Sequence, residues 1–252
     1  KNFWSYEFWG FVQPETVDDR LLRGGPLTRK PAEWQLQSQV TTDTRRAIVG
    51  EAEYEYNRNA QREWRHTVSL GMELRPTSAV RVQLQPEFVR QYDVDQYVTD
   101  LRDATAQATY GGRWIFGHID QSELSVETRA EWTFSPTLTL QLYAAPFVAT
   151  GHNSDWREVS NPRAGRTADR FHPFTGRGDA AQLDFNVKEF RLSAVARWEY
   201  RPGSTLFFVW TQGRDQAGAD NGVFNAGRDF TNIFRMRPDN TFLIKASYRL
   251  GT

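Results

Sequence analysis

Apolar and polar residues alternate with a period of two over long stretches of the chain. Between Glu63 and Arg75 the even-numbered positions carry Trp, His, Val, Leu, Met and Leu, and the odd-numbered positions carry Glu, Arg, Thr, Ser, Gly, Glu and Arg. The alternation returns over 123–134, 190–200 and 242–250. Because successive side chains of a β-strand point to opposite faces, this period predicts strands with one apolar and one polar face.

Ten strands follow from this pattern and from the turn residues that interrupt it. They are predicted at 2–13, 33–42, 46–57, 63–75, 79–92, 120–134, 138–150, 184–201, 204–213 and 240–250. The connections alternate in length. Short turns of Pro, Gly, Thr, Ser and Asp are predicted at 43–45, 76–78, 135–137 and 202–203. Longer segments are predicted at 14–32, 58–62, 93–119, 151–183 and 214–239.

Strand length and the placement of aromatic residues favour a membrane protein. Twelve residues at about 3.3 Å each, tilted by about 40°, span roughly 30 Å, the thickness of a bilayer core. Aromatic residues gather at strand ends, where membrane barrels carry interfacial girdles. The predicted girdle residues are Tyr54 and Trp64 toward the long loops, and Trp132, Phe134, Trp198 and Tyr200 beside the short turns.

The fold class indicated is all-β: one domain over residues 1–252 that forms an antiparallel, up-and-down transmembrane β-barrel of about ten strands. Short turns at one end and long loops at the other are typical of such barrels in bacterial outer membranes. A soluble β-sandwich is the alternative, because alternation gives the same pattern with inside and outside exchanged. Strands longer than ten residues argue against the sandwich, whose strands are usually shorter.

Composition excludes several other classes. The formal net charge is zero and Lys or Arg never run longer than a pair, so nothing indicates nucleic-acid binding. The absence of cysteine excludes disulfides, thiolate metal sites and a cysteine nucleophile. No apolar run approaches the length of a transmembrane helix. The chain opens at Lys1, which is expected of a processed product or a fragment.

Five segments of the chain carry a resemblance to a known family. They are residues 18–26 (DDRLLRGGP), 105–113 (TAQATYGGR), 132–143 (WTFSPTLTLQLY), 197–207 (RWEYRPGSTLF) and 238–245 (PDNTFLIK). Through them the chain resembles an uncharacterised family of bacterial outer-membrane β-barrels, whose longer members carry an N-terminal module similar to family-nine carbohydrate-binding modules. The resemblance implies an outer-membrane location and, through the neighbouring module, a connection with carbohydrate.

The resemblance has two departures. The family's barrel is longer than this chain, so the chain is either a complete ten-stranded barrel or the C-terminal part of a larger one. The chain also ends on Gly251 and Thr252, whereas barrel assembly signals commonly end on an aromatic residue.

Charged residues on the odd-numbered positions are the main candidate functional set, because a charge facing lipid at mid-membrane is costly. The residues predicted to line a lumen are Glu51, Glu53, Arg65, Glu73, Arg81, Glu87, Glu127, Arg129, Arg191, Arg197 and Lys245. One interpretation is a polar pore whose charges select solutes. The other is a ladder of cross-strand Glu–Arg pairs that fills a narrow barrel, and strand number decides between them.

Two weaker signals concern catalysis and metal binding. His152 and Ser154 in a predicted loop are residue types of a Ser/His hydrolase, although adjacency in a loop does not supply the geometry. Acidic groups at 93–103 and 215–229 are read as solvated loop carboxylates, because they lack the spacing of a Ca²⁺ loop.

The sequence therefore predicts an outer-membrane pore or uptake component for small polar solutes, with carbohydrate suggested by the resemblance. Its expected partners are membrane lipid and other outer-membrane or periplasmic subunits, and no cofactor, metal or catalytic residue is assigned. A structural or partner-binding membrane protein with a filled lumen is the second hypothesis, and an outer-membrane hydrolase is the third.

Overall fold

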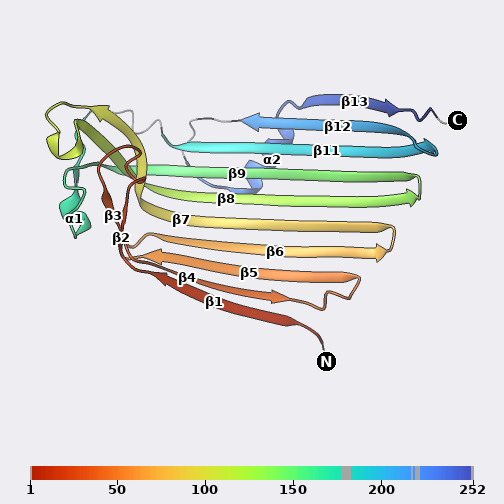
Figure 1. Ribbon diagram of the computed structural model, residues 1–252, viewed down its shortest axis with the longest axis horizontal. Helices are drawn as coiled ribbons and strands as arrows, with labels where there is room; N and C mark the ends of the chain where they lie inside the picture. Colours follow the sequence, from red (N-terminus) through yellow and green to blue (C-terminus); the bar gives the residue numbers. More distant parts are fainter. Residues whose placement is uncertain (1, 177–182, 217, 219–221, 251–252) are drawn as a thin grey trace.

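The computed structural model, which describes residues 2–176, 183–216, 218 and 222–250, is built on one antiparallel sheet (Figure 1). Its ten long strands are β1 (Ser5–Gln13), β4 (Glu33–Thr41), β5 (Ile48–Asn59), β6 (Trp64–Thr77), β7 (Val80–Arg102), β8 (Gly112–Ser135), β9 (Leu138–Val159), β11 (Phe185–Arg201), β12 (Ser204–Gln216) and β13 (Asp239–Ser247). Each pairs with the next in this order, so the sheet is an up-and-down meander. The prediction of an all-β, antiparallel fold is confirmed.

Smaller elements lie at the long-loop end and on one face of the sheet. They are the hairpin β2 (Thr16–Asp18) and β3 (Thr28–Lys30), the 3-10 turn η1 (Gln107–Thr109), α1 (Thr167–Arg170), β10 (Phe171–Pro173) and α2 (Ala226–Arg235). The hairpin forms a separate two-stranded sheet. β10 pairs with the end of β9 that lies away from the short turns, and this end of the sheet is here called the outer end. None of these elements was predicted from the alternation.

All ten predicted strands are present, but three of them extend into segments predicted as loops. β7 continues to Arg102, β8 begins at Gly112 and β9 continues to Val159. The register shifts three times in these extensions, once between Asp93 and Gln96, once between Tyr97 and Thr99 on β7, and once beyond Phe116 on β8. Each shift moves later side chains to the other face, so the two-residue period no longer marks the strand.

The register also shifts beside three short turns, after Leu74, Thr133 and Glu199. Between these irregular positions it preserves parity across the sheet. Val68 pairs with Phe88, Phe88 with Leu124, and Leu124 with Val148. The same rule holds from β1 to β13, where Tyr6 pairs with Val40 and Trp210 with Phe242. All even-numbered side chains of the regular segments therefore share one face, here called the even face, and all odd-numbered ones share the odd face.

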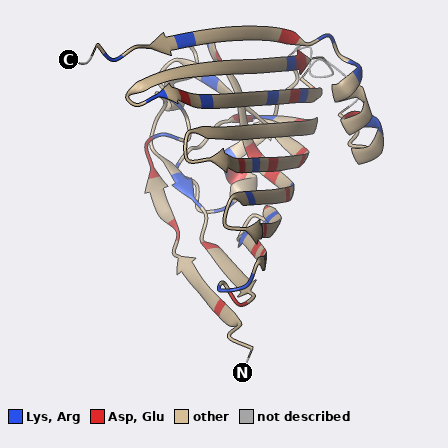
Figure 2. Ribbon diagram, turned by 90° about the vertical axis from the view of Figure 1, so that its right-hand side faces the viewer, with Lys and Arg blue, Asp and Glu red and all other residues tan. Residues whose placement is uncertain are grey.

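The sheet does not close into a barrel within the described residues. β1 and β13 each pair on one side only, and the first and last strands stand far apart in the bent sheet of Figure 2. The predicted closed ten-stranded barrel is therefore not seen. The bend accumulated over these ten strands does not bring β13 back to β1, as closure requires a matching combination of strand number, tilt and stagger.

Two small hydrophobic clusters fix the elements that the alternation missed. Leu22 from the β2–β3 segment packs with Trp114, Phe116, Val159 and Phe171 at the outer ends of β8 and β9. The second cluster joins α2 to the even face. Among the described residues, no helix is long and apolar enough to cross a membrane.

Helix α2 is held on the even face by one side of its surface. Ile233 is fully buried against Val148 and Phe190, and Phe230 packs at the edge of the same cluster. Asn225 begins the helix by accepting a hydrogen bond from the backbone N–H of Arg228. Arg214 of β12 donates to carbonyl groups at the other end of the helix.

Replacing Ile233 by Ala should therefore release α2 from the sheet. Removing a fully buried Ile side chain costs about 2–5 kcal/mol, so backbone amides of α2 should lose protection in hydrogen exchange while those of β8 and β9 keep theirs. Arg235→Ala, at an exposed position on the same helix, is the control and should leave protection unchanged. Equal protection in both variants would show that Ile233 does not dock the helix.

Candidate functional site

The odd face carries every residue predicted to line a lumen. Glu51, Glu53, Arg65, Glu73, Arg81, Glu87, Glu127, Arg129, Arg191, Arg197 and Lys245 all lie on it. The face is most acidic on β5, where Glu51 and Glu53 form no ion pair within the described part of the chain. It becomes less polar on the last strands, where Val195, Val209 and Leu243 share it.

The ion pairs of the odd face run mainly along strands and not across them. Arg129 lies 2.9 Å from Glu127, and Arg197 lies 3.3 Å from Glu199, both on the same strand. Arg81 and Glu73, 2.9 Å apart, join neighbouring strands. The predicted cross-strand ladder of Glu–Arg pairs is therefore only partly realised, and much of this face remains open to solvent.

The even face carries the predicted aromatic residues in two groups. Trp132 and Phe134 stack with ring centres 4.6 Å apart near the short turns, and Trp198 and Tyr200 lie beside the next short turn. At the other end, the Tyr54 hydroxyl lies 2.6 Å from His66 Nδ1, and Trp64 packs against the same histidine ring. Large apolar side chains between the groups, such as Leu70 and Met72, are exposed.

The two aromatic groups are separated by a defined length of strand. Trp64 pairs with Tyr92, which pairs with Asp120 of β8. Trp132 lies twelve residues further along β8, so the groups are about 40 Å apart along the strand. A tilt of about 40° reduces this separation to about 30 Å along the barrel axis.

A hollow of about 500 Å³ lies where the β2–β3 segment folds over the odd face. The wall of the hollow is formed by Glu55 and Asn57 of β5, Arg65 of β6 and Gln91 of β7. Asp18, Leu21 and Lys30 cover it from the other side. The lining combines carboxylates, amides and cations, and so offers both donors and acceptors of hydrogen bonds.

The β2–β3 segment is fixed in place from its far side. The Thr28 hydroxyl donates to the carbonyl of Pro162 (2.8 Å), and Arg170 Nη1 donates to the carbonyl of Arg29 (2.6 Å). Arg23 lies over the ring of Tyr97, 4.4 Å from its centre. With Leu22 in the buried cluster, these contacts make the segment a fixed wall of the hollow.

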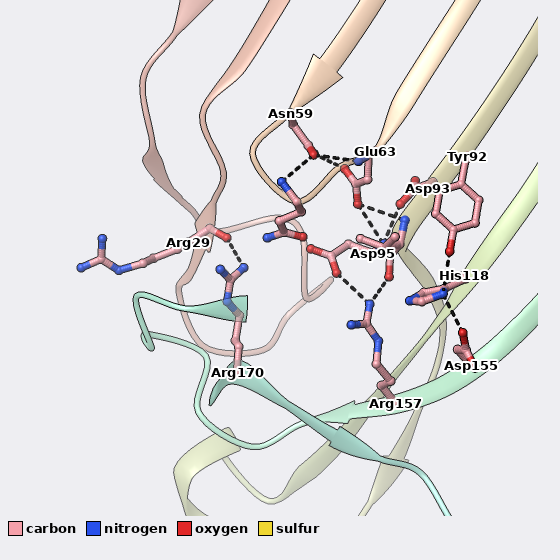
Figure 3. A network of polar contacts seen from close by, with 12 residues as sticks. Arg29, Asn59, Glu63, Tyr92, Asp93, Asp95, His118, Asp155, Arg157 and Arg170 are labelled. Carbon is pink, nitrogen blue, oxygen red and sulfur yellow. Dashed lines mark hydrogen bonds and ion pairs between the residues drawn. The ribbon is translucent and has the colours of Figure 1, made fainter. Parts of the chain in front are cut away.

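The bulge in β7 supplies the second fixed point, and Figure 3 shows its polar network. Because the register shifts after Asp93, the backbone N–H groups of Val94 and Asp95 have no partner in the ladder. Both donate to Glu63 Oε1, at 3.1 and 3.0 Å. Glu63 lies at the end of the β5–β6 turn, where the side-chain amide of Asn59 also donates a hydrogen bond to it.

Arginine residues from β9 and α1 face the other side of this network. Arg157 forms an ion pair with Asp95 at 3.3 Å and donates to the carbonyl of Val94 (Figure 3). The side chain of Arg170 is almost completely buried nearby. The network therefore joins β7, β9, α1, the β5–β6 turn and the β2–β3 segment at the outer end of the sheet.

Two carboxyl groups of this network titrate far from their usual range. Burial, together with the charges of Asp93 and Asp95, raises the pKa of Glu63 to about 8. Burial raises the pKa of Asp95 to about 6, against the opposing effect of Arg157. Glu63 is thus largely protonated at neutral pH and can share its proton with Asp93.

The residues of the hydrolase hypothesis are not assembled into a triad. His152 Nδ1 lies 2.6 Å from Asp184 Oδ2, and His118 Nδ1 lies 3.0 Å from Asp155 Oδ2. Ser154 forms no hydrogen bond with either histidine in the described part of the chain. Among the described residues, no group of three His, Cys, Asp or Glu side chains is placed to hold a metal ion.

The sequence pattern did not indicate a role for Glu63, Arg157 or Arg170. Asp93 and Asp95 were predicted as solvated carboxylates of a loop, whereas the structure places Asp95 against Arg157. No local pattern marks Glu63 as a partner of a bulge 31 residues away. Of the second acidic group, Asp220 lies outside the described residues, while Asp229 forms a buried ion pair with Lys188.

The protein is therefore an all-β antiparallel meander whose sheet has one apolar face and one polar face. The chain belongs to the family described as a domain of unknown function, DUF5916, whose model matches residues 1–251. The match does not include a carbohydrate-binding module, so that part of the resemblance is not confirmed.

Other comparisons add little to the family assignment. A search among curated proteins gives no match. A solved structure titled "Copper transporter OprC" aligns over 96% of this chain with 11% identity and a TM-score of 0.44. The chain spans 37% of that structure's length. A TM-score of this size does not establish a shared fold, so the fold assignment depends on the strands themselves.

The protonation of Glu63 predicts how the outer network responds to pH. Folding raises the pKa of Glu63 from its ordinary 4.5 to about 8, so its contribution to stability is complete below pH about 4.5 and is lost as pH rises through 8. Asp95 changes in the same direction, from 3.8 to about 6. Protection factors of the Val94 and Asp95 amides, which correct for intrinsic exchange, should therefore fall as pH rises from 5 to 8.5.

Glu63→Gln is the matched control for this effect. A neutral amide can donate to Asp93 as the protonated carboxyl does. The part of the fall in protection factors that Glu63 causes between pH 6 and 8.5 should therefore disappear, and only the part due to Asp95 should remain. An unchanged decline in the variant would mean that Glu63 is not the titrating group.

Proposed function

We propose that the chain is a wall of a bacterial outer-membrane β-barrel that admits small polar solutes. The observation that carries the proposal is the division of the sheet into an exposed apolar face and a charged face, kept in parity over ten strands. An exposed apolar face of this extent is unfavourable in water and is covered in a soluble protein.

The spacing of the aromatic groups supports a bilayer as the environment of the even face. Their separation of about 30 Å along the axis equals the thickness of a bilayer's hydrocarbon core. Trp and Tyr favour the interfacial layers on either side of this core. The short turns at the Trp132 end then face the periplasm, and the extended ends of β7, β8 and β9 project outward.

The open edges of the sheet support a larger barrel. Within a membrane every backbone N–H and C=O group needs a partner, so only closed sheets span it. β1 and β13 each expose one edge within the described residues. We infer that further strands pair with these edges, which gives a barrel of more than ten strands with room for an aqueous lumen along the odd face.

The hollow beside the β2–β3 segment supports small polar solutes as the cargo. Its lining places Glu55, Asn57 and Arg65 around a space of about 500 Å³. Hydroxyl groups can donate to such carboxylates and accept from guanidinium groups, so carbohydrates are among the solutes that suit it.

A structural or partner-binding role is the second candidate, favoured by the fixed β2–β3 segment that partly covers the odd face. In that case the lumen is filled and no current flows. Catalysis is not part of the proposal.

Conductance separates these two candidates. The full-length protein in a planar bilayer should conduct and should prefer cations, because Glu51 and Glu53 face the lumen without ion-pair partners in the described part of the chain. Glu51→Gln with Glu53→Gln should reduce this preference. Asp169→Asn, an exposed change in α1, should not. A stable insert without current would favour the filled lumen.

Neighbouring arginine substitutions test the assignment of the two faces. Leu70→Arg places a charge in the exposed apolar face and should cost about 2–4 kcal/mol of folding free energy in a bilayer if the site is near the midplane. Ser69→Arg, on the odd face next to Glu87, should be tolerated because it gains an ion-pair partner. Folding titrations in lipid vesicles measure both. Equal costs would contradict the assignment.

A further inference from the structure

The end of α2 that leads into β13 carries a concentration of positive charge. Arg235 and Arg237 are exposed and form no hydrogen bond or ion pair within the described residues. Arg214 joins them from β12, donating to the carbonyl groups of Phe234 at 2.6 Å and Met236 at 3.2 Å. Asp239, which opens β13, is the nearest carboxylate in sequence to Arg235 and Arg237.

The charged residues at the start of the helix and beneath it pair with Asp229 and are not part of this group. Lys188 on the even face lies 3.6 Å from Asp229 of α2, and both side chains are almost fully buried. Asn186, the backbone N–H of Asn225 and the guanidinium of Arg228 also donate hydrogen bonds to Asp229. The helix thus covers Lys188. Of its two arginines, Arg228 pairs with Asp229 and Arg235 is exposed.

The outward side of α2 also carries an aromatic residue. Phe234 is 56% exposed, and its ring centre lies 5.5 Å from that of Phe190 on the sheet. In Figure 2 the helix stands against the outside of the sheet, at the start of the last strand. Exposed basic side chains close to an exposed aromatic ring suit a membrane interface, where cations meet headgroup phosphates and rings favour the headgroup layer.

An apolar hollow of about 280 Å³ lies on the even face, further along β12 and β13. Ala194 and Ala196 form its floor, between Leu140 on one side and Phe208 and Phe242 on the other. The rings of Trp210 and Phe242 stack at its upper end, 6.2 Å apart. Phe242 follows Asp239 by three residues, about 10 Å along β13.

We propose that this end of α2 and the hollow form a binding site for one anionic phospholipid. Its phosphate binds Arg235 and Arg237, and one acyl chain lies in the hollow over Ala194 and Ala196. Guanidinium groups suit phosphate because they offer paired donors in a plane. The acyl chain packs against the apolar side chains that line the hollow. This inference rests on the proposed location of the even face in lipid.

The test is lipid retention by the full-length protein in detergent, measured by native mass spectrometry. Phosphatidylglycerol and phosphatidylcholine with the same acyl chains are the probes. The protein should retain phosphatidylglycerol in preference. Arg235→Gln with Arg237→Gln should weaken this binding roughly a hundredfold, the size expected for loss of two charge-assisted hydrogen bonds, one from each arginine. Arg20→Gln with Arg166→Gln, at exposed loop positions, is the matched control and should not weaken it.

A second variant tests the acyl-chain half of the site. Ala196→Phe fills the hollow and should weaken retention of phosphatidylglycerol without changing the folded state on a heat-modifiability gel. Equal retention of the two lipids by the wild-type protein would overturn the proposal, and so would an equal loss in the control variant. Displacement of the lipid by inorganic phosphate at the same concentration would show a free-anion site instead.

The outcomes also separate this inference from the proposed function. A protein that inserts into phosphatidylcholine vesicles and shows no arginine-dependent lipid preference lacks the lipid site but keeps its membrane location. A protein that stays soluble without detergent and inserts into neither kind of vesicle contradicts the membrane location itself.

Discussion

Cross-strand hydrogen bonding in a register that preserves parity is the interaction on which the rest of the structure depends. Each strand pairs even-numbered residues with even-numbered residues, so Leu70, Phe88 and Leu124 share one face while Glu53, Glu87 and Glu127 share the other. A slip of one residue in any pair would exchange the faces of the strands beyond it. Short turns at Ser78, Pro136 and Pro202 join neighbouring strands at one end of the sheet.

The outer end of the sheet is organised by the places where that register breaks. The bulge after Asp93 turns β7 and frees two backbone N–H groups, and Glu63 accepts hydrogen bonds from both. Arg157 and Arg170 neutralise the carboxylates around the bulge and hold the β2–β3 segment over the odd face. The register shift in β7 therefore determines the shape of the hollow, whereas regular strand pairing forms the sheet below it.

Regular pairing could be predicted from the sequence, and the irregular parts could not. The ten strands follow from alternation that is visible in segments such as 63–75 and 123–134. The extensions of β7, β8 and β9 were missed because each bulge inverts the alternation within a few residues. Helix α2 was missed because only Phe230, Ile233 and Phe234 are large and apolar in 226–235, and its stability comes from docking on Val148 and Phe190. The closure of the barrel could not be derived from strand count alone.

Accessibility of spin labels along one strand tests the central claim most directly. The chain has no cysteine, so single cysteines can be introduced at each position from 124 to 132 of β8 without background labelling. In lipid vesicles the accessibility of the labels should have a period of two. Lipid-soluble oxygen should increase the relaxation rate of labels at 124, 126, 128, 130 and 132, and a water-soluble nickel complex should increase that of labels at the odd positions. Accessibility to the nickel complex at every position, or the reverse assignment of the two faces, would contradict it.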